Sequence, residues 1–140
     1  MSQASDYLEN KLLDHTLRNT AFTSPTAVYV GLFLSTTDAA TTVANLEAGT
    51  LTDEVSGNGY ARVQATFGAA HATNGSITTS GNVTFAAANG GDFGTITHIA
   101  ILDQFTGGNV LFYGALTTSK QIQDGDTFQI TTGNLTVTLA

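Results

Sequence analysis

The sequence has few or none of the residues on which several classes of protein depend. Its 140 residues include no cysteine, no tryptophan and a single proline, and the only basic residues are Lys11, Arg18, Arg62 and Lys120. The absence of cysteine excludes a disulfide scaffold and thiolate metal sites. Four scattered cations in a chain of net charge −7 cannot neutralise a row of phosphates, so we expect no contact with nucleic acid.

Long apolar runs are missing as well. No stretch approaches the roughly 20 apolar residues that span a bilayer, and the first six residues lack the basic start and apolar core of a secretion signal. We therefore expect no membrane partner and synthesis in a cytoplasm. A chain of this length is expected to form one domain, residues 1–140, with a core that needs no metal or disulfide.

One segment, residues 6–19, has the pattern of an amphipathic helix. Asp6 as N-cap and Glu9 three residues later form a capping-box pattern, and the helix must end before Pro25. Four leucines fall on one half of the helical wheel and predict a face that packs against the core of its own chain, or against a neighbouring subunit or the capsid. They are Leu8, Leu12, Leu13 and Leu17.

From residue 27 to residue 139 the sequence predicts strands and turns. Residues 27–34 are apolar on both faces, which indicates a central strand covered twice. Turn signals containing Asn, Asp and Gly recur between short β-rich runs. They predict an antiparallel β-sandwich or jelly roll of about eight strands with one N-terminal α-helix. Two hairpins are expected, one formed by 95–103 and 109–116, the other by 127–132 and 135–139 through Gly133-Asn134.

Residues 35–58 do not fit this pattern. Structureless loops longer than about 12–15 residues are usually functional arms or disordered segments. The pattern leaves room for a short helical turn at 43–48, and without a partner we expect the long loop to be mobile.

No motif that carries chemistry stands out. The histidines lie far apart without the spacing of a zinc site, and His98, inside an apolar strand, is expected to be a packed structural residue. Asp124-Gly125-Asp126 lacks the later ligands of a calcium loop and predicts a polar turn. A Ser-His-Asp triad is defined by geometry alone, but no nucleophile elbow occurs. We expect no enzyme, no metal and no cofactor.

Arg62 is the one charge inside a clearly predicted strand. Its planar guanidinium suits bidentate pairing with a carboxylate. We expect a fixed pair with Asp53 or Glu54, inside the fold or across a subunit boundary. The alternative is a solvated position beside Tyr60 and Gln64.

Four segments carry a resemblance to a known family: 7–33, 54–67, 97–116 and 124–139. In this order they resemble small virion proteins of tailed bacteriophages, which are often labelled tail fibre or head decoration proteins. Glu followed by a glycine-rich turn and Tyr-Ala-Arg recurs in that family, and here these residues are Glu54 and Tyr60-Ala61-Arg62.

The resemblance implies a head decoration (cement) protein on the outer surface of the capsid. Such a protein would be made in the host cytoplasm, bind the major capsid protein as a homotrimer and stabilise contacts between capsid subunits. A tail or tail-fibre component is the alternative. A carbohydrate-binding jelly roll for host adsorption is a further one, which the lack of tryptophan disfavours. The candidate interface residues are Leu8, Leu12, Leu13, Leu17, Glu54, Tyr60 and Arg62.

Overall fold

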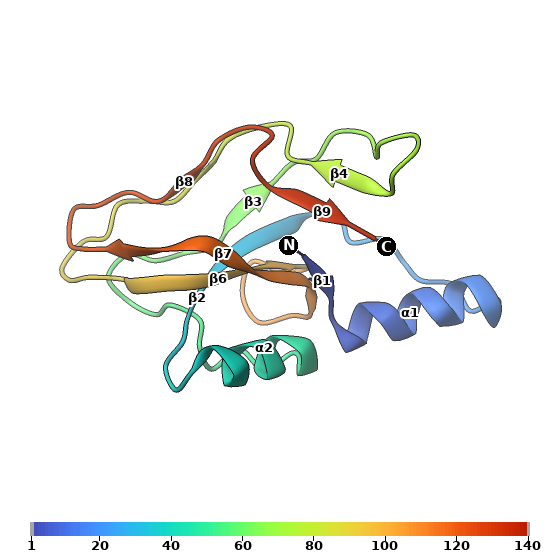
Figure 1. The fold of residues 1–140 in the computed structure, drawn as a ribbon, viewed down its shortest axis with the longest axis horizontal. Coiled ribbons are helices and arrows are strands. Elements are labelled where there is room, and N and C mark those ends of the chain that lie inside the picture. The colour runs from blue at the N-terminus through green and yellow to red at the C-terminus, as the bar shows by residue number, and fades with distance from the viewer. Residues whose placement is uncertain (1, 140) are drawn as a thin grey trace.

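The structure, a computed structural model, describes residues 2–139 and is organised around a five-stranded antiparallel sheet (Figure 1). The longest strands, β6 (Gly94–Leu102) and β7 (Val110–Ile122), form the predicted hairpin. The mainly β, antiparallel class is thus confirmed. In spatial order the sheet contains β1 (Gln3–Ala4), β7 (Val110–Ile122), β6 (Gly94–Leu102), β2 (Val28–Leu34) and β3 (Val63–Ala65).

Both faces of the sheet are covered, as the apolar pattern of β2 predicted. Val30 and Leu32 belong to a core on one face, and Phe33 belongs to a second core on the other. Because successive side chains of a strand alternate between faces, a strand that is apolar throughout needs cover on both. The strand pairs with β3 on one side and β6 on the other, which makes it internal to the sheet.

The layer over one face consists of two short ribbons and loops. One ribbon pairs β4 (Ser76–Thr78) with β9 (Thr136–Thr138), and the other pairs β5 (Val83–Thr84) with β8 (Gln129–Ile130). The expected sandwich or jelly roll of about eight strands is therefore not confirmed: residues 2–139 form nine strands, of which five make the central sheet and four lie in these ribbons.

The predicted C-terminal hairpin is wrong. The strands β8 and β9 do not pair with each other, because each pairs with an earlier segment of the chain. At the Gly133-Asn134 turn, the Gly133 amide donates to the carbonyl of Thr79 at 3.0 Å, which directs the chain from one ribbon to the other.

A second helix covers the opposite face of the sheet, so the expectation of a single helix is also wrong. This helix, α2 (Ala39–Ala48), lies inside the stretch 35–58 that was expected to be a mobile loop. The Asp38 side chain caps its start by accepting from the Thr41 amide at 2.8 Å. Gly49 ends it in the left-handed conformation, with φ of 80°. Leu46 on this helix is fully buried against Phe33 and its neighbours.

The N-terminal helix α1 (Asp6–Leu17) ends two residues earlier than predicted, and its N-cap is Ser5 instead of Asp6. The Ser5 hydroxyl accepts from the Leu8 amide at 3.3 Å and donates to the carbonyl of Val110, which fastens the start of the helix to β7. Figure 1 shows the rest of α1 projecting beyond the sheet. Neither α1 nor α2 is long and apolar enough to span a membrane.

Candidate interaction surfaces

The predicted pairing of Arg62 is confirmed, with Glu54 as the partner inside the same chain. The Arg62 Nε donates to Oε2 of Glu54 at 2.7 Å, and Nη2 donates to Oε1 at 3.1 Å. Two nearly parallel bonds of this kind form the fork geometry that favours arginine over lysine. The Arg62 side chain is only 3% exposed and that of Glu54 is 18% exposed, so the pair is largely shielded from water.

The same guanidinium also fastens a turn. Its Nη1 donates to the carbonyl of Gln104 at 2.8 Å and to that of Gly107 at 2.7 Å. Both carbonyls belong to the 103–109 turn that joins β6 to β7. Arg62 therefore uses all three of its nitrogens within the chain and fixes the tip of the longest hairpin.

Tyr60 belongs to the core next to this pair. Its hydroxyl oxygen accepts from the Leu32 amide at 3.0 Å, and its ring stacks on Phe85 and meets Phe93 edge-on. Burial is the main cause that raises the pKa of Tyr60. Thus three of the predicted interface residues, Glu54, Tyr60 and Arg62, direct their side chains to partners inside the fold.

A second polar network joins α2 to the sheet. The buried Asp53 accepts from the Thr42 hydroxyl at 2.9 Å, from the Asn45 amide at 3.4 Å and from the Thr36 hydroxyl. These hydrogen bonds, the one from Thr36 foremost, lower the pKa of Asp53. No buried side-chain nitrogen or oxygen among the described residues lacks a hydrogen-bond partner, so the buried polar groups are hydrogen-bonded within the fold.

The expectation that His98 is a packed structural histidine is confirmed. The residue is only 3% exposed, and its Nδ1 lies 2.8 Å from the hydroxyl of Thr97 on the same strand. Loss of solvent on burial lowers the pKa of His98.

Three carboxylates meet where α1 approaches α2. Oxygens of Asp6, Glu9 and Glu47 lie within 4.8 Å of one another, and within residues 2–139 this is the only group spaced closely enough to hold a metal ion. The Tyr113 hydroxyl donates to Glu47, and burial, followed by the nearness of Asp6, raises the pKa of Glu47. Two of the three carboxylates are exposed, and nothing else at this position indicates an ion.

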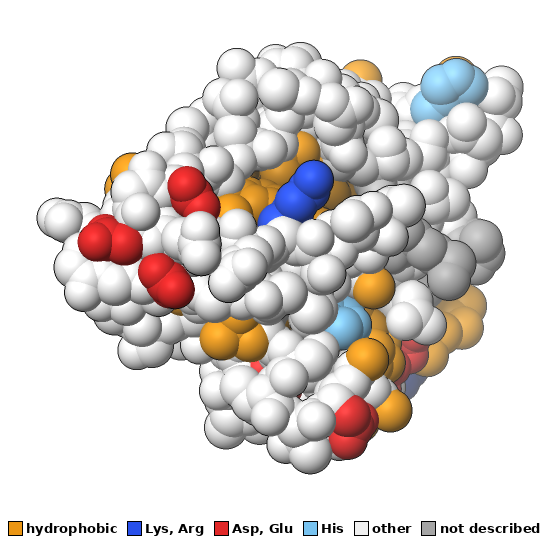
Figure 2. Space-filling view, turned by 60° about the vertical axis from the view of Figure 1, so that its left-hand side comes forward, with side chains coloured by type: hydrophobic (Ala, Val, Ile, Leu, Met, Phe, Trp, Pro, Cys, Tyr) orange, Lys and Arg blue, Asp and Glu red, His pale blue; other side chains and the backbone are white. Residues whose placement is uncertain are grey.

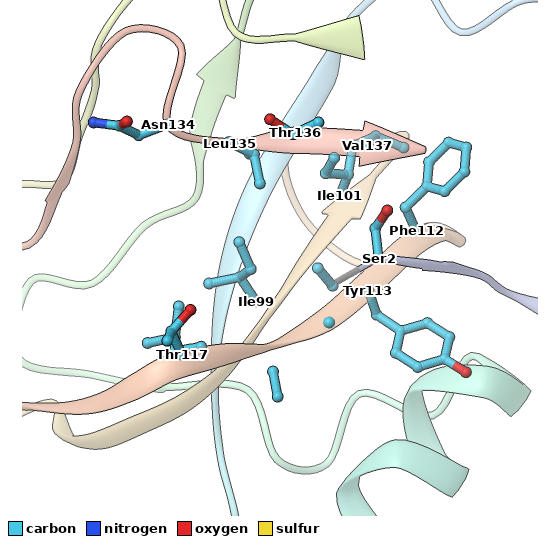
Figure 3. Close-up of a pocket in the computed structure, with 14 residues that line it drawn as sticks. Ser2, Ile99, Ile101, Phe112, Tyr113, Thr117, Asn134, Leu135, Thr136 and Val137 are labelled. Atoms are coloured by element: carbon cyan, nitrogen blue, oxygen red, sulfur yellow. The ribbon is translucent and has the colours of Figure 1, made fainter. Parts of the chain in front are cut away.

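Two hollows lie between the ribbon of β4 and β9 and the central sheet. The smaller, about 240 Å³, is lined by both polar and apolar groups. Figure 3 shows Leu135, which precedes β9, and Val137 of β9 above Ile99 and Ile101 of β6, with Thr117 and Asn134 at the other end of the hollow. The Tyr113 ring points away from this space toward α2 (Figure 3).

The larger hollow, about 400 Å³, is lined almost only by apolar surface and is named here the apolar pocket. It opens to solvent, and its wall combines side chains from both layers of the fold. They include Val28, Phe67, Ile77, Leu111, Val137 and Leu139. Leu139 is 53% exposed, which makes it the accessible edge of the pocket.

The leucine face predicted on the N-terminal helix is divided by the structure. Leu8 is 5% exposed and Leu12 is partly buried, whereas Leu13 is 55% and Leu17 is 78% exposed. Of the two partners expected for this face, the core of the same chain covers only the first half of the helix, and packing of the distal half against another subunit or the capsid stays a prediction. We name residues 11–18 the α1 arm.

The rest of the surface carries few charges. Figure 2 shows the acidic side chains of one face spaced apart among uncharged groups.

A family model described as podophage GP4 fiber I protein gp80 matches residues 3–138, which is nearly all of the chain. The chain belongs to this family. It is thus a phage virion structural protein of a fibre family, and the resemblance to tailed-phage virion proteins is confirmed.

No curated protein matches the chain. The family match covers the central sheet, both ribbons, both helices and the two networks around Arg62 and Asp53, so the fold described above is the family's own domain. Sequence reasoning placed Leu13 and Leu17 on one helix face but missed the apolar pocket. The pocket has no local signal, because its wall is assembled from five separate parts of the chain.

Proposed function

We propose that this chain is a non-enzymatic building block of a phage tail fibre, and that it acts by binding other virion proteins. The match to a fiber protein family over residues 3–138 is the observation that supports this role. The structure agrees with a binding function, because its buried polar side chains are hydrogen-bonded inside the fold, while apolar side chains stay exposed on α1 and around the apolar pocket.

Self-association is part of this proposal. Contiguous exposed apolar surface on a soluble chain usually marks a protein contact, and Leu13 and Leu17 are the predicted interface residues that stay accessible. The homotrimer remains a prediction. Sedimentation equilibrium at micromolar concentrations tests it, since a trimer has three times the mass of the chain and a monomer would contradict the prediction.

Decoration of the capsid is the second candidate. The net charge of −7 favours a position outside the head, away from packaged DNA, where the protein would bind the major capsid protein. A binder selective for the assembled shell stabilises it by mass action at every site it occupies.

The number of copies in the virion separates the two candidates. Quantitative mass spectrometry of purified particles gives the ratio of this chain to the major capsid protein. A tail-fibre component occurs at a small fraction of the capsid subunits and stays with isolated tails, whereas a decoration protein occurs in proportion to them and stays with tailless heads. Recovery with heads alone would contradict the fibre proposal.

A further inference from the structure

Three asparagines are followed directly by glycine: Asn58, Asn74 and Asn89. Because glycine has no side chain, its backbone nitrogen can approach the side-chain amide carbon of the asparagine before it. Attack by that nitrogen modifies the chain without an enzyme. All three asparagines are exposed to water, so exposure does not distinguish them. Their hydrogen bonds do.

The Asn74 side chain folds over the glycine that follows it. Its Oδ1 accepts from the Ser76 amide at 3.1 Å and from the Ser76 hydroxyl at 2.6 Å. The first bond closes an Asx turn, a ring that contains both the Asn74 amide carbon and the Gly75 nitrogen and keeps them near each other. Two donors on one carbonyl oxygen stabilise the negative charge that develops there during attack. Within residues 2–139 the Gly75 amide has no acceptor, so no hydrogen bond holds its proton.

The Asn58 side chain is held elsewhere. Its Nδ2 donates to the Asp92 carbonyl at 2.9 Å. The side chain also packs closely on Gly91, where an added Cβ would lie 2.8 Å from that Nδ2. Turning this amide toward the Gly59 nitrogen would break the hydrogen bond and the contact together.

At Asn89 the attacking nitrogen is the hindered group. The Gly90 amide donates to Oδ1 of Asp124 at 3.1 Å. The nitrogen reacts after losing its proton, and here that loss removes a hydrogen bond and places a negative charge beside a carboxylate. Among the three asparagines, Asn74 alone combines a carbonyl with two donors and a glycine nitrogen that no acceptor holds.

We propose that Asn74 is a site of spontaneous deamidation, with water as the only co-reactant. The Gly75 nitrogen bonds to Cγ of Asn74, the bond from Cγ to Nδ2 breaks, and ammonia leaves with the proton that the nitrogen loses. Water then opens the resulting succinimide at one of its two carbonyls. Opening at the side-chain carbonyl gives aspartate, and opening at the main-chain carbonyl gives isoaspartate, in which the chain runs through the former side chain. The reaction does not depend on the proposed role in the virion.

Both products lie beside the apolar pocket, whose wall includes Gly75, Ser76 and Ile77. Each product carries a negative charge where Asn74 was neutral, and isoaspartate also lengthens the main chain. The Gly75 carbonyl accepts from the Leu139 amide at 2.9 Å, and a Cβ on Gly75 would lie 2.8 Å from the Leu139 carbonyl oxygen. Because the two backbones are this close, isoaspartate should loosen the end of the ribbon of β4 and β9.

The test is peptide mapping by mass spectrometry of the purified full chain after incubation in mildly alkaline buffer at physiological temperature. The replacement of an amide NH2 by OH gives the mass change, and chromatography separates aspartate from isoaspartate peptides. We expect Asn74 to react several-fold faster than Asn58 and Asn89 in the folded chain. In urea, where the hydrogen bonds are lost, the three rates should approach one another. If Asn74 reacts no faster than Asn89 in the folded chain, or keeps an equal lead in urea, the proposal is overturned.

A variant tests the hydroxyl donor directly. Ser76→Ala removes the hydroxyl bond to Asn74 and keeps the amide bond, so deamidation of Asn74 should slow by about two- to tenfold, the factor that one hydrogen bond of ordinary net strength gives. Ser80→Ala is the matched control, because the Ser80 hydroxyl donates to Thr66 and should leave the rate at Asn74 unchanged. A Ser76→Ala chain that reacts at the parent rate contradicts the proposed activation.

Hydrogen exchange at the Leu139 amide measures the effect on the ribbon. The aged chain, enriched in isoaspartate, should exchange this proton faster than freshly prepared Asn74→Asp, which has the same charge on a main chain of normal length. Equal exchange in the two chains would mean that the ribbon accommodates the longer main chain, and the expected loosening would then be wrong.

Discussion

Removing the Arg62 side chain should destabilise the fold more than removing any other basic side chain. Arg62→Ala leaves the Glu54 carboxylate without its partner and deletes both bonds from Nη1 to the 103–109 turn. Loss of one member of a buried ion pair costs about 3–5 kcal/mol, because the remaining charge is poorly hydrated. Glu54 keeps 18% of its side chain exposed, so we expect the lower part of that range.

The measurement is thermal and urea unfolding followed by circular dichroism. For a chain of this size roughly 3–4 °C of melting temperature corresponds to 1 kcal/mol, so we expect a decrease on the order of 10 °C or more. Lys120→Ala is the matched control, because Lys120 is exposed and such charges contribute under about 1 kcal/mol. Arg62→Lys should lie between the two, since an ammonium group cannot form the fork with Glu54.

A second comparison separates the pair from the turn. Glu54→Gln keeps hydrogen-bond acceptance by one oxygen and leaves the two carbonyl bonds of Arg62 intact, so it should cost less than Arg62→Ala. If Arg62→Ala and Lys120→Ala melt at the same temperature, the buried pair does not stabilise the fold and the reasoning fails.

Three further predictions follow from buried or closely packed groups. Leu8→Ala should cost about 2–5 kcal/mol because Leu8 is 5% exposed, whereas Leu17→Ala should change the unfolding free energy of the single chain little; equal losses in urea unfolding would contradict this. The pKa of Glu47 is raised above its ordinary value of 4.5, so the folded chain binds a proton on this carboxyl more tightly than the unfolded chain does. The contribution of Glu47 to stability is therefore greatest below pH 4.5 and is lost as pH rises through the raised pKa. Relative to the parent, Glu47→Gln should therefore gain melting temperature from acid to neutral pH; a constant difference would contradict this. A Cβ on Gly31 would lie 3.0 Å from Oε2 of Glu54 and 3.1 Å from Leu102, so Gly31→Ala should cost about 1–3 kcal/mol, while Gly68→Ala, which meets nothing within 4 Å, should be close to neutral in the same assay.

The elements that sequence reasoning predicted well are those whose signals are local. The hairpin of β6 and β7 combines two apolar runs with a glycine turn, and both strands lie next to each other in sequence and space. The pairing of Arg62 spans only eight residues, and the local pattern predicted a partner at Asp53 or Glu54. In each case the partner is near enough in the chain for residue type and spacing to limit the choice to one or two candidates.

The C-terminal strands were misassigned because their partners are distant. Two apolar runs flanking Gly133-Asn134 have the local pattern of a hairpin, yet β8 pairs with β5 and β9 pairs with β4, each more than 40 residues earlier. A turn signal shows where the chain changes direction, but it does not identify the strand that accepts its hydrogen bonds.

The helix α2 was anticipated only as a possible short turn at 43–48, and its full extent was missed for a different reason. Its cap residues, Asp38 before the first turn and Gly49 after the last, are the usual start and stop signals. The intervening Thr41, Thr42 and Val43 are β-branched and have low helix propensity. Burial of Leu46 in the core and the hydrogen bond from Thr42 to Asp53 outweigh that preference, and neither can be seen in the sequence alone.

The distribution of polar and apolar groups is the structural basis for the proposed role in assembly. Buried polar side chains such as Arg62 and Asp53 are hydrogen-bonded within the chain. What the chain does not satisfy internally is apolar surface: two leucines on a projecting helix and a pocket with an almost wholly apolar wall. Such surface is stabilised by removal from water and requires no chemistry from its partner. Under the proposed structural role, neighbouring virion proteins supply that cover.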